Sequence, residues 1–321
     1  MLVFVTQVAF AGERVVVVRD PAAVTGLDVD AARVRVMVSK GIQTLTGQTT
    51  DATAWSVFAG SNDVVGIKVN VRAAPLHAPH EALLEAVAAG LQSAGVVATN
   101  IIVWDVDPAK LRAAGYRFDA PIQVRAVIED TGWDEAMVFE SKVVGKLIWG
   151  DLEFGRDASG ISERSHLPRL LTRTVTKLIN MPVLLDHETY GLSGCLHNIS
   201  LGAVDNARRF ELTGRGESEI AEMCVAAAIK DKLVLNILDA LVGGYAGGPS
   251  FKPQYSWPAG ELLFSRDPVA VDTLCLEKIE KKRKEAHVPA IDKRAAHIVA
   301  VGQLGVGVAT REKIEVMEVT P

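Results

Sequence analysis

The chain has 321 residues, of which 49% are hydrophobic and 23% are charged, and its formal net charge is −5. This composition is typical of a globular protein with a large buried core and argues against intrinsic disorder. The acidic balance argues against nucleic acid as the main partner, since proteins that bind it usually carry a basic stripe. The sequence contains no apolar run of about eighteen residues, so we expect no transmembrane helix.

The N-terminal segment allows two interpretations. Residues 1–11 are apolar and end in Ala9-Phe10-Ala11, a small-residue pattern typical of a signal-peptidase site. The segment is either the remnant of an export signal, which predicts a periplasmic or extracellular protein and which we favour, or a first β-strand, which fits a cytoplasmic protein. Residues 12–321 are expected to form a single domain, with two lobes that meet near Thr172 as the alternative.

The first half of the chain predicts alternating strands and helices. Residues 14–19 are expected to form a strand, 28–45 a helix and 54–58 a short helix. The nearly continuous apolar strand 63–70, a helix with Pro79 at its first position and Gly95 at its end, and a strand at 100–105 then have the length of a βαβ unit. Such a unit predicts two parallel strands with a right-handed connection.

The second half continues the pattern with fewer helices. Strands are expected at 121–127, 143–149, 175–185, 233–239, 261–264 and 314–319, and helices at 107–111, 218–228, from Asp267-Pro268 onward and at 289–301. Residues 150–169 are interpreted as a long polar loop or lid. Residues 243–249 are interpreted as a loop, because four Gly and one Pro in seven residues suit neither a helix nor a strand. The expected fold is α/β, with a mixed, mostly parallel sheet and helices on both faces in a Rossmann-like layering.

Polar side chains occur where several predicted strands end. The residues are Lys68, Asn70, Asp105, Asp186, His187 and Asp239. Because the carboxyl ends of parallel strands lie along one edge of a sheet, we expect these side chains to line a single crevice. The alternative for each Asp is a helix cap or a turn.

His187 is the predicted centre of the chemistry. With Asp186 or Asp239 beside it, an imidazole can act as general acid and base. His187 and His197, ten residues apart, also have donor types that suit a divalent zinc, iron or manganese ion, with Asp272, Asp186 or Asp239 as the carboxylate ligand. The competing interpretation is that one histidine bonds to loop backbone and the other is exposed.

A second pattern predicts an anion site. Arg266 precedes a helix N-terminus, where backbone N–H groups and the helix dipole attract anions. Lys68 and the glycine-rich residues 243–248 would complete the cradle, although no nucleotide-binding glycine motif is present. The alternative role for Arg266 is a surface or structural ion pair.

The cysteines point to neither disulfides nor clusters. Cys195, Cys224 and Cys275 form no Cys-x-x-Cys pair, so we expect no cysteine-ligated zinc or iron–sulfur cluster. Cys195 is interpreted as a small buried loop residue, with a nucleophile activated by a nearby histidine as the alternative.

Several of these segments occur together in one known family. They are Val65-Gly-Ile-Lys-Val-Asn70, residues 100–105, residues 180–187, Gly191-Leu-Ser-Gly194 with Asn198, Asp239-Ala-Leu241, Gly248-Pro249 and residues 265–272. By their order the chain resembles, over residues 15–279, the bacterial and archaeal family catalogued as domain of unknown function 362. Some members carry ferredoxin-like cysteine clusters, which implies redox contexts, but this chain lacks them. Many members have Lys where this chain has His197, which implies a positive or hydrogen-bonding group that faces an anion.

The sequence is compatible with two functions. The first is an enzyme, metal-assisted or redox-linked, that acts on a small anionic substrate. In it Lys68, Asn70, His197, Asn198 and Arg266 bind the substrate, and His187, Asp186 and Asp239 carry the chemistry. The second is a non-catalytic protein that binds an anionic metabolite or cofactor in the same crevice. The sequence predicts neither the oligomeric state nor the substrate.

Overall fold

A ten-stranded sheet forms the centre of the computed structural model, which describes residues 13–117, 121–140, 164–207, 209–210 and 216–321. The strand order is β14-β1-β13-β12-β9-β4-β5-β6, and β10 and β11 join it beside β12. The strands are β1 Glu13–Arg19, β4 Val65–Val69, β5 Ile101–Asp105, β6 Gln123–Ala126, β9 Lys177–Met181, β10 Val183–His187, β11 Gly191–Leu192, β12 Leu233–Gly244, β13 Ser256–Ser265 and β14 Ile314–Val319.

The sheet is mixed and mostly parallel, as predicted. Parallel pairs join β4 to β5 and β9, β5 to β6, β12 to β9 and β10, and β1 to β14. Antiparallel pairs join β13 to β1 and β12, and β10 to β11. In the register of the central strands, Lys68 lies beside Asn180, and Asn180 lies beside Asn236. Three polar residues are therefore level with one another in the middle of the sheet.

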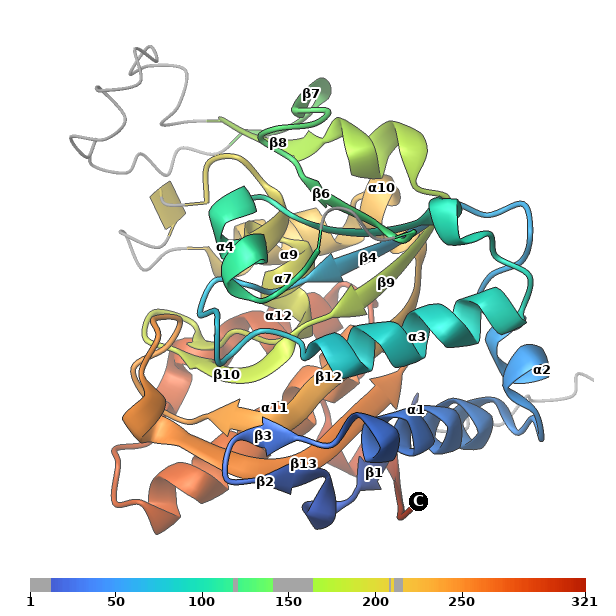
Figure 1. The fold of residues 1–321 in the computed structure, drawn as a ribbon. Helices are drawn as coiled ribbons and strands as arrows, with labels where there is room; N and C mark the ends of the chain where they lie inside the picture. The colour runs from blue at the N-terminus through green and yellow to red at the C-terminus, as the bar shows by residue number, and fades with distance from the viewer. Residues whose placement is uncertain (1–12, 118–120, 141–163, 208, 211–215) are drawn as a thin grey trace, which may run out of the picture.

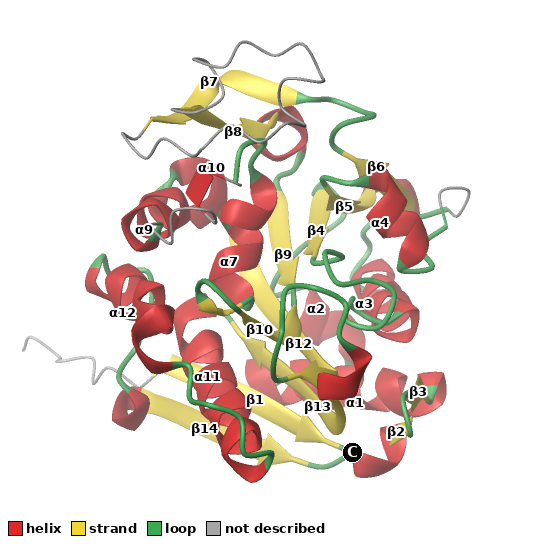
Figure 2. Cartoon of the chain, turned by 90° about the vertical axis from the view of Figure 1, so that its left-hand side faces the viewer, coloured by secondary structure: helices red, strands yellow, loops and turns green. Residues whose placement is uncertain are grey.

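Helices cover both faces of this sheet. On one face lie α1 Ala31–Thr46, α2 Asp51–Trp55 and α3 Glu81–Ser93, and on the other lie α7 Cys195–Ile199, α9 Glu217–Val225, α11 Pro268–Glu285 and α12 Ala296–Gln303 (Figures 1 and 2). Two large apolar cores result, one on each face. Alternate residues of a strand enter opposite cores, so the alternation decides on which face each polar side chain lies.

Smaller elements complete the described part of the chain. They are α4 Pro108–Ala113, α10 Ala227–Lys230, the two-stranded pairs β2 Val24–Thr25 with β3 Asp28–Val29 and β7 Trp133–Glu140 with β8 Arg164–Pro168, and short 3-10 or π turns. None of the described helices is long and apolar enough to cross a membrane.

The structure corrects three predicted elements. The expected strand 175–185 is two strands, β9 and β10. Pro182 lies between them in the chain and has no N–H group to donate to a neighbouring strand. The expected loop 243–249 begins as strand, since Gly243 and Gly244 pair with Trp257 and Ser256 in β13. The Trp257 ring occupies the space where a Gly243 side chain would lie. The end of the expected loop 150–169 forms β8. Residues 1–11, the predicted strand 143–149 and the start of that loop lie outside the described residues.

Candidate functional site

A cavity of about 320 Å³ lies beside the carboxyl ends of β4 and β5. Its lining includes Lys68, Asn70, His197 and Asn198, four of the five residues that the sequence predicted to bind substrate. The structure does not place the fifth, Arg266, in this cavity. Arg266 is exposed, and its guanidinium lies over the Phe58 ring, 5.2 Å from the ring centroid.

Lys68 is a buried cation at this cavity. Ile67 and Val69 enter the core on the α3 side, so strand alternation turns Lys68 toward α7. Its side chain is 1% exposed, its Nζ donates to Val69 O at 2.8 Å and Asn198 Oδ1 at 3.0 Å, and Asp105 Oδ2 lies 3.3 Å away. Burial lowers the pKa of Lys68, and the carboxylate of Asp105 opposes this change.

Buried amides hold the lysine in place. Asn198 Nδ2 donates to Lys68 O at 3.0 Å and to Asn180 Oδ1 at 2.8 Å, and Asn180 Nδ2 donates to Asn236 Oδ1 at 2.9 Å. Each amide uses both its donor and its acceptor group, so the network fixes the Lys68 side chain in one position. The sequence pattern identified Asn198 but not Asn180 and Asn236. Each of these two is a polar residue inside an apolar strand, and this feature could have identified them.

His197 lines the same cavity. Its side chain is buried, and neither ring nitrogen has a hydrogen-bond partner among the described residues. The His197 ring contacts the rings of His187 and Tyr190, with centroids at 4.8 Å and 5.9 Å. Burial, followed by the charge of His187, places the pKa of His197 well below its usual value, so the imidazole is neutral.

His187 and Asp186 are next to each other in β10 but have different partners. His187 Nδ1 accepts hydrogen bonds from the backbone N–H groups of Thr189 at 3.1 Å and Tyr190 at 3.2 Å. Asp186 Oδ1 accepts from Gly248 N at 2.9 Å, and its Oδ2 lies 3.5 Å from the buried Arg283 guanidinium. Burial raises the pKa of Asp186 to about 6, against the opposing effects of Gly248 N–H and Arg283.

Asp239 pairs with a histidine that the sequence pattern did not single out. Its Oδ2 accepts from the backbone N–H of His80 and lies 2.8 Å from His80 Nδ1. Leu238 and Ala240 enter the core on the α7 side, so Asp239 points to the opposite face, where His80 precedes α3. The Asp239 charge raises the pKa of His80 despite burial, which by itself would lower it. The only sequence signal for this pair was a histidine at a helix start.

Asp272 holds the N-terminus of α7. Its two carboxylate oxygens accept from Cys195 N at 2.6 Å and Leu196 N at 2.9 Å. A side chain at Gly194 would collide with this carboxylate, so glycine is required there. Burial raises the pKa of Asp272 to about 7, although these two hydrogen bonds act to lower it.

In the described part of the chain, no group of three or more His, Cys, Asp or Glu side chains is arranged to hold a metal ion. The predicted metal site at His187 and Asp272 stays a prediction.

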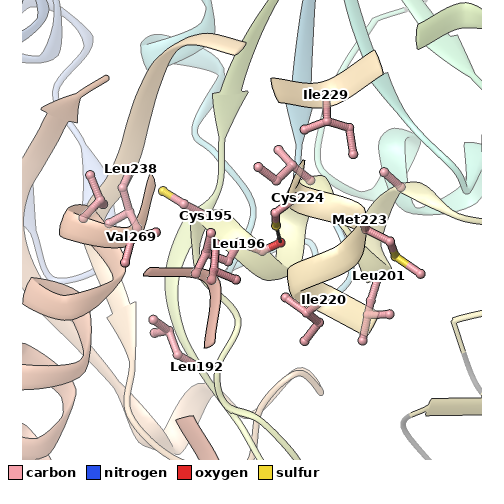
Figure 3. Packing of buried hydrophobic residues seen from close by; sticks show 14 of the residues in the cluster. Leu192, Cys195, Leu196, Leu201, Ile220, Met223, Cys224, Ile229, Leu238 and Val269 are labelled. Atoms are coloured by element: carbon pink, nitrogen blue, oxygen red, sulfur yellow. Dashed lines mark hydrogen bonds between the residues drawn. The ribbon is translucent and has the colours of Figure 1, made fainter. Parts of the chain in front are cut away.

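The cysteines belong to the core on the α7 side. Figure 3 shows Cys195 among apolar side chains near Leu238 and Val269, and Cys224 beside Leu196, whose carbonyl oxygen lies 3.9 Å from its Sγ. Burial raises the pKa of Cys195 far above its usual value, so its thiol stays protonated. This environment fits the small buried residue that we favoured over a nucleophile. Cys195 is the first residue of α7, however, so its predicted place in a loop was wrong.

Replacement of His297 by leucine is expected to stabilise the protein, most at acidic pH. His297 in α12 is fully buried with no partner for either ring nitrogen among the described residues, and burial lowers its pKa to about 3. The folded state therefore stays neutral while the unfolded chain takes up a proton below pH 6.5, so stability is lost as pH falls. We expect a gain of about 1–3 kcal/mol at pH 8 and about 2 kcal/mol more at pH 5, measured by urea denaturation. An equal gain at both pH values would contradict the titration.

A comparison with models of protein families agrees with the family resemblance. The family model described as a domain of unknown function (DUF362) matches residues 65–277, and the chain belongs to this family. No curated protein matches the chain. Among solved structures it is similar to a Thermotoga maritima protein, a Northeast Structural Genomics Consortium target, with 11% identity and a TM-score of 0.44. The match covers 81% of this chain and 60% of the Thermotoga protein, so the chain matches less than two thirds of that protein's length.

Proposed function

We propose that the protein is an enzyme that binds a small anionic substrate in the cavity at Lys68. The observation that carries this proposal is a lysine ammonium buried beside a cavity at the carboxyl ends of parallel strands, where α/β proteins bind ligands. Arg72 and Lys110 add two positive charges to the lining.

The two carboxylates of the lining both accept hydrogen bonds from backbone N–H groups. Asp107 caps α4 by accepting from Ala109 N and Lys110 N. Asp105 accepts from the backbone N–H of Val71 and lies beside Lys68. Backbone dipoles therefore offset part of their charge, and the cavity favours an anion.

The lowered pKa of Lys68 supports catalysis over binding alone. Burial brings the ammonium closer to releasing a proton at physiological pH, which is the property that a general acid or base needs. A second polar group, His197, lies in the same lining. Groups with shifted pKa values are concentrated at functional sites, which favours the enzyme over a protein that only binds small acids.

The test is thermal stabilisation by a panel of acetate, phosphate, sulfate and small mono- and dicarboxylates. We expect at least one of these anions to raise the melting temperature of the wild type. The same anion should not change the melting temperature of Lys68→Met. It should also not change that of Lys68→Met/Asp105→Asn, a double variant that removes one positive and one negative charge together. Lys232→Met is the matched control, because Lys232 is half-buried and also has a pKa lowered by burial, but bonds to Leu171 O and Thr172 O outside the cavity.

The outcomes separate the two functions. Stabilisation that persists in both Lys68 variants would overturn the proposed site. An acid that binds through Lys68 is then incubated with the protein in D₂O and followed by NMR. Exchange of its carbon-bound hydrogen or its conversion supports the enzyme, whereas an unchanged acid favours the non-catalytic binding protein.

A further inference from the structure

His197 is a buried polar side chain whose hydrogen-bonding groups have no partner in the described part of the chain. Both ring nitrogens are shielded, and the side chain is 2% exposed. A buried donor or acceptor without a partner destabilises the folded state, so such groups in native proteins call for a partner. The cavity that His197 lines is the available space for that partner.

The surrounding structure fixes His197 beside the cavity. It lies in α7, whose first N–H groups bond to Asp272 and whose Asn198 bonds to Lys68. The rings of His187 and Tyr190 pack against the imidazole and hold it in place. His197 itself belongs to the lining of the cavity. Lys68 is near enough for its charge to act on the imidazole.

The hydrogen-bonding groups of a neutral imidazole determine which ligand groups can bind to it. It presents one N–H donor and one nitrogen acceptor, whereas Lys68 presents only donors. A carboxylate can accept from Lys68 but has nothing to donate to the imidazole, whereas a hydroxyl both donates and accepts. The remaining walls of the cavity include Val71, Leu201 and Val204, which suit a short carbon skeleton.

We propose that the cavity takes a small hydroxy acid, whose carboxylate pairs with Lys68 and whose hydroxyl bonds to His197. This inference rests on the proposed anion site and adds the class of its ligand. His197 thus recognises the hydroxyl, and Lys68 recognises the charge.

The experiment compares acids that differ by one hydroxyl, lactate against propionate and malate against succinate, by calorimetric titration. In the wild type the hydroxy member of at least one pair is expected to bind about tenfold tighter or better, because a hydrogen-bonding site rejects the analogue that lacks the group. In His197→Phe this preference should disappear while the affinity for the deoxy acid stays within about threefold. In His197→Gln, which keeps a donor and an acceptor, part of the preference should return.

The results distinguish the two proposals. Equal binding of both members, with loss of both in Lys68→Met, overturns the role of His197 and leaves the anion site intact. No binding of any of the four acids overturns the hydroxy-acid inference, and the broader panel of anions then decides on the anion site. Should the His197 variants fail to fold, the ring ¹⁵N resonances of His197 in the wild type decide, because the inference requires them to shift with lactate or malate and not with the deoxy partner.

Discussion

Replacement of Asp272 by alanine is expected to lower the free energy of unfolding by about 3–5 kcal/mol at pH 7, since each buried N–H group left without its acceptor costs about 1–3 kcal/mol. The variant would leave the N–H groups of Cys195 and Leu196 without their acceptor in the interior. Both lie at the start of α7, the helix that carries His197 and Asn198 to the cavity. Urea unfolding at pH 7, with the slope compared between variants, measures the change.

The pH dependence of this effect follows from the raised pKa of Asp272. With a value of about 7 in the folded state, the side chain holds a proton that the unfolded chain releases above about pH 4. Its contribution to stability is therefore fully present below the unfolded pKa and is lost as pH rises through 7. The destabilisation by Asp272→Ala should be about 2–3 kcal/mol larger at pH 5 than at pH 9.

Asp30→Ala is the matched control. Asp30 also accepts from two backbone N–H groups, Ala32 N and Arg33 N, at the start of α1, but it is exposed. Water can replace it, so the expected loss is about 1 kcal/mol. Equal losses in the two variants would contradict the claim that burial makes the Asp272 cap decisive.

The sequence predicted the fold well where patterns are local. Apolar runs and caps placed β4, α3 and β5, and Asp107 and Asp267 cap the helices predicted after them. The crevice at the strand ends followed from the same parallel unit, which is why the sequence pattern identified Lys68 and Asn70.

Pairings between distant residues could not be predicted in this way. Asp239 was considered as a partner of His187, but it points away from the core that Leu238 and Ala240 enter. It pairs there with His80, 159 residues earlier in the chain. Asp186 meets Arg283, which lies on a helix 97 residues further along the chain. Arg266 was placed in the cradle because it precedes a helix, whereas it directly follows β13, which runs antiparallel to β12. The position of Arg266 therefore depends on the direction of the preceding strand, and the local sequence pattern does not predict that direction.

Lys68→Met is the second change with a large expected effect. It removes the ammonium beside Asp105 and the donor to Asn198 Oδ1, both in the interior. Removal of one partner of a buried ion pair typically destabilises by about 3–5 kcal/mol, and we expect about 3 kcal/mol here because backbone N–H groups still bond to Asp105. Asp105→Asn should be destabilising for the complementary reason, an ammonium left without its counter-ion.

The double variant shows whether the two side chains act as a pair. With both charges removed, Lys68→Met/Asp105→Asn should be less destabilised than the sum of the single variants, by a coupling energy of about 1–3 kcal/mol. Strict additivity would mean that Lys68 is held by the amide network alone. In that case its charge is not balanced within the protein and stays available to an anion in the cavity, so the affinity for the acid should then be unchanged in Asp105→Asn. Strong coupling instead predicts tighter binding in Asp105→Asn, because the ligand's carboxylate no longer competes with Asp105 for the same ammonium.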